Sequence, residues 1–155
     1  MKKLLLLITH GMMLVLGFGL GIYALPILTQ PDKPSMTEIG QVATSALFTD
    51  QFERDLEGSD ALHYGSGTLY INANKIAFDG HISPGPDYKL YLSPVFVENK
   101  TDFLVNKDKM LNIGDVRTFN GFMLDIPEGI NPADYQAVVI WCESFNLFIT
   151  AAKYH

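Results

Sequence analysis

Hydrophobic and polar positions divide the chain into an uninterrupted apolar N-terminal stretch and a longer part with short alternating segments. Leu4 to Leu28 is a run of 25 residues without one charged side chain. A helix rises about 1.5 Å per residue, so about 20 residues cross a hydrocarbon layer of about 30 Å. The stretch therefore predicts one transmembrane helix, a signal-anchor segment over residues 1–28.

The pattern changes after this segment. Pro31 and Pro34 punctuate a polar run, and we assign residues 29–45 to a linker. A short helix is expected from Thr37, as a candidate N-cap, to Asp50. Residues 46–155 are assigned to one β domain.

Within that domain, short runs rich in branched and aromatic residues are separated by turn signals. They predict strands at 68–71, 75–78, 88–92, 137–142 and 146–152, and a strand pair within 115–125 around the hairpin dipeptide Asn120-Gly121. Residues 98–109 are charged and predict a loop. Both faces of 137–142 are apolar, so this strand should be central and covered on both sides. The predicted fold is all-β, an antiparallel β-sandwich or partly open barrel preceded by one N-terminal transmembrane helix.

Composition excludes several classes of function. The formal net charge of −6 argues against nucleic-acid binding, which needs a basic face. A single cysteine excludes an internal disulfide framework and a cysteine-rich zinc site, and no metal site is predicted. The sequence contains no nucleophile elbow, no phosphate-binding glycine loop and no His-Glu-x-x-His motif. A redox or binding module is therefore favoured over an enzyme with its own substrate.

The charges beside the apolar stretch predict its orientation. Lys2 and Lys3 precede it, and the positive-inside tendency keeps such a flank in the cytoplasm and exports the rest. We therefore expect a single-pass protein of the cell membrane with an extracytoplasmic C-terminal domain. The alternative is a secretory signal cleaved after Ala24, which would leave a secreted domain. The stretch is longer than the usual apolar core of a signal peptide, about 7–15 residues, which favours the anchor.

Three segments in order resemble the DM-thirteen domain, a family labelled as an electron-transfer domain and grouped with DOMON-like β-sandwich modules. His63 to Thr68 resembles its His-x-Gly-Ser-Gly opening, and Gly85 to Ser93 resembles its Gly-Pro-Asp strand. Tyr135 to Ala151 resembles its Val-Trp-Cys segment with a trailing Phe. The resemblance covers about Phe52 to Tyr154. It departs at Asn120 to Pro127, where family members often carry a more polar stretch.

The resemblance implies an extracytoplasmic redox role centred on Cys142, with a redox partner protein. The cofactor is left open: either a bare thiol acts, or a thiolate holds a prosthetic group such as haem. His63 and Asp87 are the candidate cofactor-binding residues, because each belongs to a matching segment. We expect the three segments to lie close together.

Each candidate residue also has a structural interpretation. Cys142 follows Trp141 on an apolar strand, which favours a buried thiol that fills space in the core. His63 could bond a backbone carbonyl at a strand edge, and Asp87 could hold the turn after its two prolines. Two functions stay open: a membrane-anchored electron-transfer module, or a non-catalytic envelope binding module with a structural cysteine.

Overall fold

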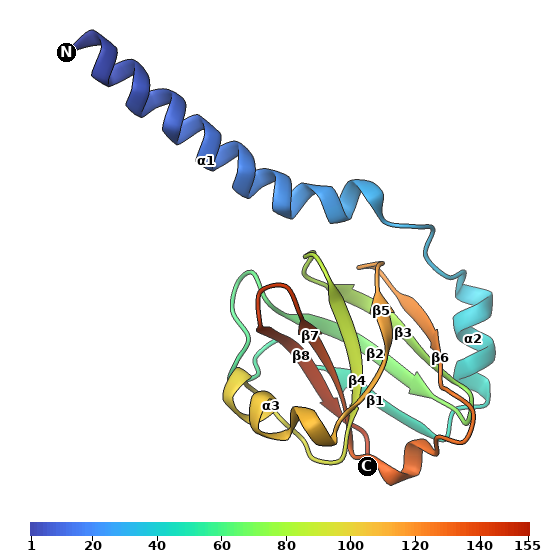
Figure 1. Cartoon of the computed structure of the whole chain (residues 1–155). Coiled ribbons are helices and arrows are strands. Elements are labelled where there is room, and N and C mark those ends of the chain that lie inside the picture. The colour runs from blue at the N-terminus through green and yellow to red at the C-terminus, as the bar shows by residue number, and fades with distance from the viewer.

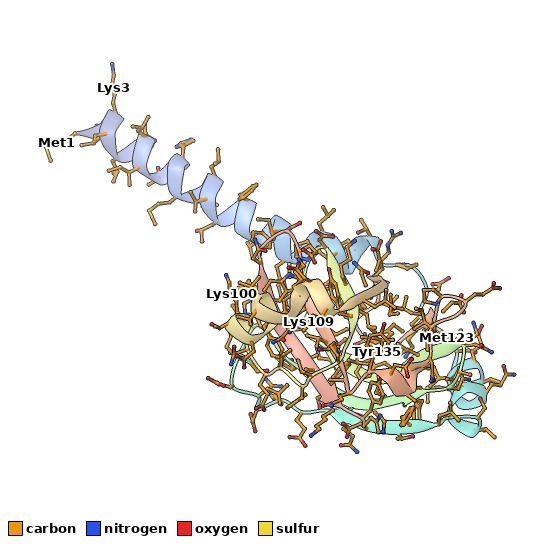
Figure 2. All side chains as sticks on the ribbon, turned by 60° about the horizontal axis from the view of Figure 1, so that its bottom comes forward. Met1, Lys3, Lys100, Lys109, Met123 and Tyr135 are labelled. Carbon is orange, nitrogen blue, oxygen red and sulfur yellow. The ribbon has the colours of Figure 1, made fainter.

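The computed structural model describes all residues, 1–155, and begins with a long helix whose N-terminal part projects away from the rest (Figure 1). Helix α1 spans Lys2–Thr29 and has no buried residue. Figure 2 shows its side chains pointing into open space from Met1 toward the domain. The helix is long and apolar enough to cross a membrane, although a signal sequence meets the same criteria.

A second helix covers one outer face of the domain. Helix α2 spans Met36–Thr44, and Ile39 and Val42 pack against Ala77. Its N-cap is Ser35, whose Oγ accepts from Glu38 N at 3.3 Å while the Glu38 carboxylate accepts from Ser35 N at 2.8 Å. The expected cap at Thr37 and the expected end at Asp50 were wrong. A reciprocal capping box satisfies two free backbone donors and starts the helix earlier.

The domain consists of two four-stranded antiparallel sheets without a closed barrel, which confirms the predicted fold class (Figure 1). One sheet has the order β1-β2-β3-β6, and the other has the order β5-β4-β7-β8. The first contains β1 (Phe48–Phe52), β2 (Gly65–Ile71), β3 (Lys75–Ile82) and β6 (Phe122–Asp125). The second contains β4 (Tyr88–Ser93), β5 (Leu111–Val116), β7 (Ala137–Cys142) and β8 (Leu147–Lys153).

Strand β7 is buried along its whole length, as its two apolar faces predicted. Val138, Ile140 and Cys142 face the main core between the sheets. Val139 and Trp141 face a second core of eight buried residues on the outer side. Helix α3 (Lys100–Asn106) covers that outer core and crosses the strands between the Lys100 and Lys109 labels in Figure 2.

Two local predictions for this region were wrong. Residues 98–109 form α3 and a 3₁₀ turn (Lys107–Lys109), because Asn99 caps the helix by accepting from Asp102 N at 2.9 Å and the buried Phe103 anchors it. The predicted hairpin around Asn120-Gly121 does not form either. Strand β5 pairs with β4, and β6 pairs with β3, so the chain crosses between the sheets there. A second 3₁₀ turn (Pro132–Asp134) precedes β7.

Candidate functional site

The three family-like segments converge on one cavity of about 150 Å³ at the end of the sandwich nearest α1. His63 comes from the loop before β2, Pro86 and Tyr88 from the turn into β4, and Cys142 from the end of β7. Phe145, in the β7–β8 connection, also lines it. The expectation that these segments lie close together is confirmed for these residues.

Cys142 is buried on a central strand, as predicted, with a residue exposure of 2%. It pairs with Tyr88 on β4 and with Leu147 on β8. Its Sγ donates a hydrogen bond to the Pro86 carbonyl oxygen at 3.0 Å. Burial raises the pKa of the thiol, and the negative charge of Asp87 adds to this. The resting side chain is therefore a protonated thiol.

Asp87 is held in the turn that carries Pro86, with its backbone in the left-handed region at φ 55°. Its Oδ2 accepts from Ser144 Oγ at 2.8 Å, and Lys89 Nζ lies 3.2 Å from Oδ1. Its carbonyl oxygen accepts from Glu143 N at 3.1 Å. The side chain lines a neighbouring cavity of about 280 Å³ and is not in the wall of the Cys142 cavity. Asp87 therefore fastens the turn to the β7–β8 connection.

His63 is oriented by a carboxylate that the sequence analysis did not single out. Its Nδ1 lies 2.8 Å from Asp60 Oδ2, and Asp60 Oδ1 also accepts from the backbone N of Leu62 and of His63. The hydrogen bond with His63 is the main reason that the pKa of Asp60 is lowered. Because a carboxylate only accepts, Nδ1 carries the proton of the neutral ring and Nε2 is an acceptor. The Asp-x-x-His spacing was the signal that could have revealed this pair.

No direct hydrogen bond joins His63 to Cys142, and no cluster of three or more His, Cys, Asp or Glu side chains could hold a metal ion. Haem, which the resemblance implied as one choice, does not fit the residues present. A cavity of about 150 Å³ is smaller than the pockets of drug-sized ligands, which begin at about 300 Å³.

The opposite face of β7 carries a second polar cluster that the sequence analysis missed. Tyr91 Oη donates to the Glu143 carboxylate, and Lys107 Nζ lies 2.7 Å from Glu143 Oε2. Burial raises the pKa of Glu143, but hydrogen bonds from Lys107 and Tyr91 outweigh it and hold that pKa below its usual value. Lys107 Nζ also lies 5.8 Å from the centre of the Trp141 ring, so this cluster borders the outer core.

Acid should destabilise the domain through the carboxylates of Asp87 and Asp115, which both form salt bridges with Lys89. The hydrogen bond from Ser144 is the main reason that the pKa of Asp87 is lowered, and the pKa of Asp115 is lowered chiefly by Lys89. A lowered folded pKa means that the stabilisation is complete above the unfolded value, 3.8 for Asp, and is lost as pH falls through the folded value. We expect the free energy of unfolding to be flat from pH 7 to about pH 5 and to fall below about pH 4. Urea titrations of the full chain in micelles measure it.

The matched variants for this pH profile are Asp87→Asn and Glu128→Gln. Asp87→Asn keeps an oxygen acceptor for Ser144 but removes the charge, so it should lower stability at pH 7 and flatten the acid limb. Glu128 is exposed on the surface, so its variant should follow the wild-type profile. A Glu128→Gln profile as flat as that of Asp87→Asn would contradict this assignment.

Comparison with known proteins gives one family. The family described as Electron transfer DM13 matches residues 39–154, from within α2 to the residue after β8. No curated protein and no solved structure matches the chain. The match covers both sheets and every residue of the Cys142 cavity except those contributed by α1. The chain therefore belongs to the electron-transfer DM13 family.

Proposed function

We propose that this protein is a single-pass, membrane-anchored electron-transfer module whose extracytoplasmic domain uses Cys142 as its redox group. The observation that carries the proposal is the convergence of His63, the Pro86 turn and the lone cysteine on one cavity. The family match supports electron transfer as the class of function. A redox partner would exchange electrons with the domain at this end of the sandwich.

The anchor is supported by the length and flanks of α1. Its uncharged run follows Lys2 and Lys3, which favours a cytoplasmic N-terminus. The helix passes into the domain through a short segment that includes Pro31 and Pro34, and the last turns of α1 line both cavities at that end. Cleavage after Ala24 would instead remove the α1 wall of the Cys142 cavity, which is formed by Gly19, Ile22 and Tyr23, and leave a secreted domain.

The size of the cavity limits the redox chemistry of the thiol. A lone cysteine can form a mixed disulfide with a partner or be oxidised to a sulfenic acid. Cys142 is 2% exposed and lies behind a cavity of about 150 Å³, which is too small to admit a thiol carried by another protein. A hydroperoxide is small enough to enter the cavity and reach the sulfur. The sulfur attacks one peroxide oxygen, the O–O bond breaks, and Cys142 becomes a sulfenic acid as water or an alcohol leaves. Because the chain has no second cysteine, reduction of the sulfenic acid back to the thiol needs an external two-electron reductant.

His63 serves this step as the proton acceptor. Thiols react as thiolates, and burial raises the pKa of Cys142, so the step needs a base in the same cavity. Asp60 holds the His63 ring by Nδ1, which leaves Nε2 free to receive the thiol proton through the cavity. Asp60 is then a positioning residue, because it acts through His63.

We expect hydrogen peroxide to add one oxygen to Cys142 in the folded full chain in micelles. The adduct should be trapped by a dimedone-type reagent, reversed by a thiol reductant and absent in Cys142→Ser, all measured by mass spectrometry. His63→Gln should slow the oxidation at least about tenfold at neutral pH, because it removes the base. His81→Gln is the matched control, since His81 bonds Asn120 outside the cavity.

A second function keeps support from the burial of Cys142. Its Sγ already donates a hydrogen bond to the Pro86 carbonyl oxygen. Its raised pKa lowers the fraction of reactive thiolate. These properties are those expected of a structural cysteine in a non-catalytic envelope binding module. Oxidation of Cys142 only at the rate of global unfolding, with equal rates in His63→Gln and wild type, would overturn the redox role of Cys142 and favour the binding module.

A further inference from the structure

The Cys142 cavity lies where α1 meets the domain. Gly19, Ile22 and Tyr23 of α1 form one wall of it. Leu4 to Ile22 is 19 residues, about 28 Å of helix, which is the thickness of a hydrocarbon layer. In a membrane-anchored chain these wall residues therefore lie at the outer boundary of the bilayer, and the cavity opens there.

The surroundings of the cavity are apolar although the domain is acidic. Eight of its 13 lining residues are hydrophobic. Leu62 and Phe145 are exposed by 66% and 48% at its rim, and the β7–β8 connection that carries Phe145 lies on the side of the domain facing α1 (Figure 1). Exposed large apolar side chains beside a membrane helix suit contact with lipid and with molecules dissolved in it.

The volume and the polar groups define what the cavity can hold. A cavity of about 150 Å³ takes up a single six-membered ring. Tyr23, His63, Tyr88 and Cys142 supply the polar side-chain groups of the wall, and Nε2 of His63 has no partner within the domain. Of the electron carriers that dissolve in a bilayer, one-ring quinones combine this size with oxygen atoms that can meet these groups.

We propose that the Cys142 cavity binds the ring of a lipid-soluble benzoquinone or its quinol, which enters from the bilayer between α1 and the domain. This inference rests on the proposed function, since the quinol is the reductant of the Cys142 sulfenic acid. The quinol gives up two electrons and two protons, and the S–O bond breaks. The thiol re-forms, and one water and one quinone leave.

The test uses the full chain in phosphatidylcholine nanodiscs, titrated with oxidised decyl-benzoquinone. The readout is the fluorescence of Trp141, the only tryptophan, which lies next to Cys142 in sequence and is fully buried. A quinone held in the cavity should quench Trp141 with a saturating dependence on its concentration in the lipid. Quenching that rises linearly without saturation would show partition into the bilayer alone and would overturn the proposal.

Two glycines of α1 give a matched pair of variants. A Cβ at Gly19 or at Gly17 meets nothing within 4 Å, so neither Gly19→Leu nor Gly17→Leu strains the fold. Only Gly19 lines the cavity. Gly19→Leu should raise the half-saturating quinone concentration at least about tenfold, and Gly17→Leu should leave it unchanged. Equal curves for the two variants would overturn the proposal.

Cys142→Ser separates this inference from the proposed function, because ring binding does not require the thiol. Saturable quenching in wild type and in Cys142→Ser, with no peroxide oxidation of wild type, would support the quinone site and overturn the proposed redox cycle. Peroxide oxidation of wild type without saturable quenching would overturn the quinone site and leave the redox cycle standing.

Discussion

Replacing Trp141 with alanine should lower the free energy of unfolding by about 3–5 kcal/mol, a large share of the total for a domain of this size. Trp141 is 0% exposed and stacks on Phe103 with ring centroids 4.0 Å apart and planes at 10°. The substitution empties the centre of the outer core, which α3 alone cannot refill. Urea unfolding of the full chain in micelles measures the loss by circular dichroism, since the variant has no tryptophan.

Two further variants isolate the cause of this loss. The Trp141 Nε1 atom has no hydrogen-bond partner, so Trp141→Phe loses ring area but no hydrogen bond and should cost about 1–2 kcal/mol. Leu104→Ala on α3 removes a side chain that is 47% exposed and should change stability by less than about 0.5 kcal/mol. A Trp141→Ala variant as stable as Leu104→Ala would show that the outer core does not hold the domain together.

The sequence pattern revealed the elements that depend on local alternation. Strand β7 was predictable because both of its faces are apolar, and the length of α1 followed from its missing charges. Helix α3 was missed because its sequence is mostly polar and charged. Only one of its side chains, Phe103, is fully buried, so it shows no apolar periodicity. The crossover at Asn120-Gly121 was missed because a hairpin dipeptide gives the same local signal whether the next strand turns back or joins the other sheet.

The candidate site shows the same limit. The family-like motifs identified His63 and Cys142 as candidate residues, and both line the cavity. Asp60 was missed because it lies outside the three family-like motifs and is linked to the site only by the hydrogen bond between its carboxylate and His63. Asp87 was chosen for the same reason as His63, but Ser144 and Lys89 draw its carboxylate to the neighbouring cavity. Which way a turn residue's side chain points depends on partners far away in the chain.

The second glycine of the His-x-Gly-Ser-Gly segment is required by the close approach of two strands. Gly67 on β2 pairs with Gly80 on β3, and Gly67 has a φ of +140°. A Cβ at Gly67 would clash with the Asp79 carbonyl oxygen, and one at Gly80 would clash with Ser66 O and lie 2.6 Å from Phe78 Cζ. The strands approach too closely here for a side chain on either residue.

Gly67→Ala should therefore cost about 3 kcal/mol or more, because backbone strain of about 1–3 kcal/mol adds to a clash of similar size. Gly80→Ala carries the clash without a positive φ and should cost about 1–3 kcal/mol. Gly129→Ala carries a positive φ of 83° with nothing within 4 Å, and should cost about 1 kcal/mol. Urea unfolding followed by Trp141 fluorescence ranks the three. Equal losses for Gly67→Ala and Gly129→Ala would mean that the strands can separate at no cost, and that the motif's second glycine serves the backbone angle alone.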